Sequence, residues 1–191
     1  MPGDFHRIGI RIPPTATERE ALEVAYDLLA TGARRVGETF TEPDDDWRPL
    51  WVLLTDTQAT IVTPGDDVDK HAATDYVGRL ARRWGAVAVG HLHSSWMVTF
   101  EDVDAERMAE IQRYMRERHG STEGLPERRE VLLIAAYSAT TARQWHAAIH
   151  RDDTQPPTLG TFDLMLDTTH DDVDLSGAMV DPLRDALRKV G

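Results

Sequence analysis

The sequence predicts a single α+β domain, in which a mostly antiparallel central sheet carries helices packed on its faces. Some segments repeat apolar residues every three or four positions, which is typical of amphipathic helices, whereas other segments are short and apolar, as buried strands are. The expected order is a leading helix, then strand, strand, helix, strand, helix, strand and strand, closed by a C-terminal helix. At 191 residues the chain suits one domain over 1–191.

The leading helix is predicted to begin at a capping box. Thr17 and Glu20 take the N-cap and N3 positions, and an apolar stripe follows them. Gly32 is the expected end of this helix, because glycine readily adopts the left-handed conformation that terminates helices. A second amphipathic helix over about 73–84 is predicted to end in the same way at Gly85.

Short apolar runs predict the strands. Two of them, over 50–55 and 57–63, are joined at Asp56 and indicate a hairpin. The run over 86–93 is apolar on both alternating faces up to its histidines, so we expect it to be the central, fully buried strand. The remaining elements are expected to be a helix over about 102–119, strands over 131–136, 144–149 and 161–166, an acidic loop over about 167–178, and a helix from Asp181.

Composition limits the classes of function. The formal net charge of −12 opposes nonspecific binding to nucleic acid or to an anionic membrane. No apolar run approaches the roughly 18–20 residues that a membrane-spanning helix needs. The N-terminus lacks the pattern of a signal peptide, so a cytoplasmic location is expected. The lack of cysteine excludes disulfides, thiolate metal ligands and cysteine nucleophiles.

One group of residues has the spacing of a metal site. His91 and His93 are two apart, so both imidazoles face the same side if this segment is a strand. Asp104 is expected in the first turn of the helix that follows. Two imidazoles, one carboxylate and a water would make a four-coordinate zinc site of the catalytic type.

This spacing, H-x-H followed by ten residues and Asp, resembles the motif of the JAMM/MPN metalloproteases. The resemblance implies a zinc-dependent hydrolase of peptide or isopeptide bonds, with His91, His93 and Asp104 as the ligands. It also implies an upstream glutamate as the general base, and Glu38 is the candidate for that role, with Glu42 as the other choice.

Two positions depart from that family's pattern. Ser94 follows the second histidine in place of a proline, and Glu101 stands three residues before Asp104, where the family has a serine. The sequence therefore leaves two interpretations open. His91 and His93 either bind a metal or form a structural pair at the edge of the core.

A second resemblance covers more of the chain, in five segments: Pro49–Leu54, Gly85–Ala86, Ser95–Met97, Arg128–Val131 and Trp145–Arg151. Together they are similar to a loose pattern in a group of uncharacterised bacterial and phage proteins. The resemblance implies no biochemical activity, because none is known for that group. The resemblance implies that Trp96 and Met97 pack in a core or an interface and have no catalytic role.

The favoured hypothesis is a non-catalytic interaction or assembly protein, associated with a phage or another mobile element and without a cofactor. Exposed tryptophans favour interfaces, and the chain has five tryptophans, so we expect a protein partner or self-association. The alternative is the JAMM-like zinc hydrolase, which would require zinc.

Overall fold

The computed structural model describes residues 4–98, 103–118, 122–169 and 180–187, and confirms an α+β fold. The described elements are, in chain order, β1 (Phe5–Arg11), α1 (Glu18–Gly37), β2 (Leu50–Leu54), β3 (Gln58–Pro64), α2 (Lys70–Trp84), β4 (Ala88–Val98), α3 (Ala105–Glu117), β5 (Arg128–Ser138), β6 (Thr141–Asp152), β7 (Gln155–Leu159), β8 (Asp163–Thr169) and α4 (Asp181–Leu187).

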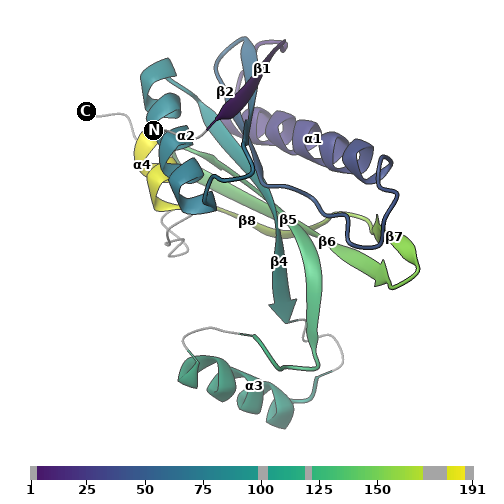
Figure 1. Ribbon diagram of the computed structural model, residues 1–191. Coiled ribbons are helices and arrows are strands. Elements are labelled where there is room, and N and C mark those ends of the chain that lie inside the picture. The colour runs from purple at the N-terminus through teal and green to yellow at the C-terminus, as the bar shows by residue number, and fades with distance from the viewer. Residues whose placement is uncertain (1–3, 99–102, 119–121, 170–179, 188–191) are drawn as a thin grey trace.

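All the described strands join one curled antiparallel sheet (Figure 1). The strand order is β1-β3-β2-β4-β5-β6-β7, and β8 pairs with β6 beside β7. The expected hairpin of β2 and β3 is confirmed, and β4 lies between β2 and β5 as a central strand. β1 lies at one edge of the sheet, where it pairs with β3.

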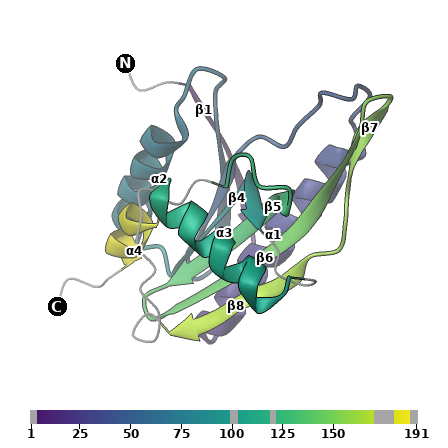
Figure 2. The same ribbon diagram turned by 90° about the horizontal axis from the view of Figure 1, so that it is seen from below.

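Each face of the sheet has its own apolar core. Helix α1 covers one face, and α2 and α4 lie together on the other, as Figures 1 and 2 show. On the α1 face, Leu22 and Leu29 pack against strand residues such as Leu92. On the opposite face, Val77 and Leu183 pack against residues such as Val89. Alternate residues of β4 therefore belong to different cores, because side chains along a strand alternate between the faces.

Local signals explain most of the helix boundaries. The Thr17 hydroxyl accepts a hydrogen bond from the Glu20 amide at 3.1 Å, as the capping box predicts, while the Glu20 carboxylate accepts from the Ala16 amide. Gly85 ends α2 with φ of 63°. The prediction that Gly32 ends the first helix is wrong, since α1 continues to Gly37 because its buried stripe extends to Ala33.

The sequence did not predict two of the strands, and part of one expected loop is strand. β1 and β7 have no clear apolar alternation, and their pairing with β3 and β6 is what forms them. Part of the expected acidic loop over 167–178 is strand, because β8 continues to Thr169 along β6; the rest of that loop lies outside the described residues. Helix α4 begins at Asp181, with the Val180 carbonyl accepting the first helical bonds.

β4 and β5 extend beyond their neighbours in the sheet. They pair along their full lengths, from Ala88 opposite Ser138 to Val98 opposite Arg128, whereas β2 follows β4 only as far as Leu92. The extension carries α3 at its end, well separated from the other helices (Figure 1). We call this extension the arm, and define it as residues 96–98, 103–118 and 122–130.

None of the helices in the described part of the chain is both long enough and apolar enough to cross a membrane.

Candidate functional site

The two histidines of β4 lie on the face of the sheet that α2 and α4 cover. A side chain added at Gly90 would meet Leu29 of α1, so the alternating positions 91 and 93 point to the opposite face. The imidazoles of His91 and His93 stack with ring centroids 5.1 Å apart, which confirms that they share one side of the strand. The ring of Tyr137 lies 5.8 Å from that of His91.

Burial keeps both imidazoles neutral. His91 is 2% exposed, and desolvation, with a smaller contribution from His93, lowers its pKa to about 3. Desolvation, with a smaller contribution from Lys70, lowers the pKa of His93 to about 4. The buried Nδ1 atoms of both rings have no hydrogen-bond partner among the described residues. Neutral rings of this kind can accept a hydrogen bond or ligate a metal, but they do not donate protons from an imidazolium near neutral pH.

The structure does not bring the predicted zinc ligands together. The Asp104 carboxylate caps α3 on the arm, where it accepts a hydrogen bond from the Arg107 amide at 2.8 Å. Within residues 4–98, 103–118, 122–169 and 180–187, no three His, Asp or Glu side chains lie close enough to share a metal ion. Among these described residues, His91 and His93 thus form a stacked pair without the third ligand that a structural or catalytic zinc site requires.

Glu38, the candidate general base, is equally remote from the histidines. It forms the C-cap of α1 and is exposed to solvent. Helix α1 packs on the face opposite to the one that His91 and His93 occupy, so the sheet itself separates this carboxylate from the imidazoles. The described residues therefore do not fit the zinc centre that the H-x-H spacing suggested, and no catalytic step is derived from it.

Trp96 is the most distinctive exposed side chain of the arm. It is 48% exposed, although tryptophan is usually largely buried. The guanidinium carbon of Arg128 lies 3.8 Å from the centroid of the indole, which is a cation–π stack. The contact is diagonal across the hairpin, because Trp96 pairs with Glu130 and Arg128 pairs with Val98.

Contacts within the arm join α3 to the strands that carry it. Val98, Ile111 and Leu125 form a small apolar core that is separate from the two main cores. Arg107 binds Glu127 with two hydrogen bonds, at 2.7 and 3.2 Å, which join α3 to the start of β5. These bonds, more than any other effect, lower the pKa of the Glu127 carboxyl. Helix α3 is therefore tied to the start of β5, the strand that carries the stacking partner of Trp96.

The structure brings together segments that the sequence treats as separate motifs. In the β4–β5 register, Trp96 lies opposite Glu130, and Met97 lies opposite Arg129. Arg151 of β6 then binds both carboxylate oxygens of Glu130, at 2.6 and 2.8 Å. The sequence pointed to Trp96 but did not predict that Arg128 stacks on it. The missing information was the register of β4 on β5, which no local pattern encodes.

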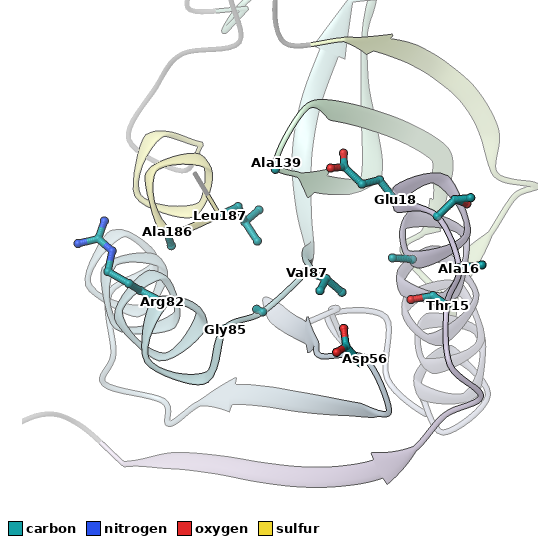
Figure 3. Close-up of a pocket in the computed structure, with 13 residues that line it drawn as sticks. Thr15, Ala16, Glu18, Asp56, Arg82, Gly85, Val87, Ala139, Ala186 and Leu187 are labelled. Carbon is teal, nitrogen blue, oxygen red and sulfur yellow. The ribbon is translucent and has the colours of Figure 1, made fainter. Parts of the chain in front are cut away.

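A cavity of about 460 Å³ lies at the other end of the sheet, between the start of α1 and the ends of α2 and α4 (Figure 3). Its walls are mainly small apolar side chains. The Glu18 carboxylate on one wall accepts hydrogen bonds from the Thr140 hydroxyl at 2.6 Å and the Thr140 amide at 3.2 Å. The Arg82 side chain points away from the cavity and donates to the Asp185 carbonyl. Glu18 and Arg82 thus have structural roles in linking helices and turns.

Comparisons with protein-family models, with curated proteins and with solved structures found no match to this chain. The two resemblances noted in the sequence therefore stay predictions.

Proposed function

We propose that this chain is a non-catalytic interaction protein that binds a protein partner through the arm. The observation that carries the proposal is the exposed Trp96, held against Arg128 at 3.8 Å on the part of the β4–β5 hairpin that extends beyond the sheet. Tryptophan and arginine are the residue types most enriched among the side chains that dominate binding energy at interfaces. Here one of each is already oriented before any partner arrives.

Contacts that orient side chains within the arm support the proposal. Ordering a flexible side chain on binding costs free energy, roughly 0.5–1.5 kcal/mol for each side chain rich in rotamers. The Trp96–Arg128 stack removes part of that cost, and the bidentate pair of Arg107 with Glu127 joins α3 to the start of β5. The association with a phage or another mobile element is a separate prediction, drawn only from the resemblance of the sequence.

Paired tryptophan substitutions test the proposal. The wild-type protein is immobilised, partners retained from the cell that makes it are identified by mass spectrometry, and the affinity of each purified partner is then measured by calorimetry. We expect Trp96→Ala to weaken binding by about 30-fold, which corresponds to the roughly 2 kcal/mol of a dominant interface residue. Trp84→Ala is the matched control, since Trp84 is also exposed, at 37%, but lies on α2.

Self-association is measured in parallel by sedimentation equilibrium. A dimer that dissociates in Trp96→Ala but not in Trp84→Ala identifies a second copy as the partner. The proposal fails if the wild-type chain stays monomeric and Trp96→Ala leaves every measured affinity within about twofold of the wild-type value, the size of effect expected at an energetically neutral position.

A further inference from the structure

The edge strand β1 has an open row of main-chain hydrogen-bonding groups. The Gly65 amide donates to the Asp4 carbonyl at 2.7 Å, and the Ile12 amide donates to the Thr57 carbonyl at 3.1 Å. If the register of β1 on β3 is continued by one residue at each end, it pairs Asp4 with Gly65 and Ile12 with Thr57. Hydrogen-bonded and non-hydrogen-bonded pairs alternate along an antiparallel ladder. The even-numbered residues of β1 therefore bond to β3, and the odd-numbered residues point their N–H and C=O groups away from the sheet.

Proline on β3 agrees with this assignment. Pro64, which has no N–H, lies opposite Phe5, one of the odd-numbered residues. No hydrogen bond from elsewhere in the described chain reaches the outward groups of Phe5, Arg7, Gly9 or Arg11. An exposed edge of this kind is a template for an added strand.

The side chains of β1 indicate what such a strand would carry. Arg7 and Arg11 are exposed and point to the α2 side, the side on which Phe5 stacks with Tyr76. Neither arginine has an ion-pair partner in the part of the chain that the structure describes, and β3 has no charged residue. Ile8 points to the α1 side and is 62% exposed, the highest value among the large exposed apolar residues of the described chain. The edge is thus basic on one side and apolar on the other.

We propose that the open edge of β1 binds an extended acidic segment of a partner protein as an additional antiparallel strand. The carboxylates of that segment would lie beside Arg7 and Arg11, and its alternate apolar residues would cover Ile8. This inference rests on the proposed function as an interaction protein, but it uses a surface distinct from the arm.

A second copy of the chain fits this edge less well. If two copies of β1 pair antiparallel about a twofold axis at Ile8, Arg7 of one copy lies diagonal to Arg7 of the other. If the axis lies at Arg7, the two Arg7 side chains lie directly opposite each other. Like charges in these positions are destabilising. Each copy also carries a formal charge of −12, so the two molecules repel as a whole. An acidic strand instead meets the two arginines of a locally basic edge.

The test uses the full chain and a synthetic peptide that alternates valine and glutamate over the length of β1, with blocked ends and a fluorescent label. A peptide alternating valine and lysine is the control. We expect saturable binding of the acidic peptide, weaker by several-fold when the salt is raised from about 50 to about 300 mM, and no binding of the basic peptide. In amide exchange by NMR, the amides of Arg7, Gly9 and Arg11 should become protected by the acidic peptide. Those of Ile8 and Ile10 should be protected with or without it.

Two substitutions at one position separate charge from backbone. Arg7→Ala removes the charge and should weaken binding by about two- to fivefold, the range for an exposed ion pair. Arg7→Pro also removes the outward N–H and should bind about tenfold more weakly than Arg7→Ala, while its melting temperature stays close to that of Arg7→Ala because this N–H makes no bond to β3.

Three results would overturn the inference: equal binding of both peptides, equal binding by Arg7→Pro and Arg7→Ala, or protection of the Arg7 and Gly9 amides in the free protein. If the acidic peptide fails to bind while Trp96→Ala still weakens a partner, this inference falls and the proposed function stands. If the peptide binds and Trp96→Ala changes nothing, the arm is not the binding surface and the edge of β1 is.

Discussion

Acid should destabilise the protein through His91 and His93, because the folded chain keeps both imidazoles neutral and the unfolded chain protonates them. Their pKa values fall from 6.5 to about 3 and about 4 on folding. Between pH 6.5 and the folded pKa values the unfolded state binds more protons, so the free energy of unfolding decreases as the pH falls through that window. Above pH 6.5 neither state binds these protons, and the stabilisation is fully present.

The size of the effect follows from the same values. At about pH 5 an unfolded imidazole is almost wholly protonated, which favours unfolding by about 2 kcal/mol for each buried histidine, or about 4 kcal/mol for the pair. That is a large part of the roughly 5–15 kcal/mol by which folded domains are stable. Urea denaturation followed by circular dichroism, at several values between about pH 8 and about pH 5, gives the free energy of unfolding by linear extrapolation.

Substitution isolates the histidines from the other titrating groups. We expect His93→Gln to lose about half of the decrease between about pH 8 and about pH 5, since one buried imidazole remains. His71→Gln, an exposed position on α2, is the matched control and should keep the wild-type slope. The reasoning is refuted if the wild-type stability is constant over this range, or if His93→Gln and His71→Gln have the same slope.

Two further predictions concern packing. Gly90→Ala should lower the free energy of unfolding by about 1–3 kcal/mol, because its Cβ would lie 2.8 Å from Leu29 Cδ1 between β4 and α1. Gly32→Ala, where the added Cβ has nothing within 4 Å, should instead raise it by up to about 1 kcal/mol. Thermal melts in which both substitutions shift the melting temperature in the same direction would contradict this. Ile111→Ala should remove most of the small core under α3 and lower the local stability of the arm by about 2–5 kcal/mol. Amide hydrogen exchange should then accelerate in α3 far more than in β6. Equal acceleration in both elements would show that the arm unfolds only with the whole chain.

Much of the fold was predictable because its signals are local. The apolar stripe of α2 and the glycine at its end specify a helix of definite length, and the two-sided apolar pattern of β4 specifies a central strand. β1 was not predictable in this way. Its residues are mostly exposed on both sides, and pairing with β3 is what makes it a strand. The predicted helix end at Gly32 was wrong for a related reason, since burial of Ala33 against the sheet outweighs the local tendency of glycine to end a helix.

The sequence by itself determined the α+β class, the central strand with its paired histidines, and the helix that follows the first hairpin, because periodicity and caps act within one or two turns of the chain. Only the tertiary structure decided what the histidines and the tryptophan face. A sheet has two sides, and α1 carries Glu38 to the side away from His91 and His93. The register of β4 on β5 brings Arg128 onto Trp96, over a separation in sequence that no local pattern can span.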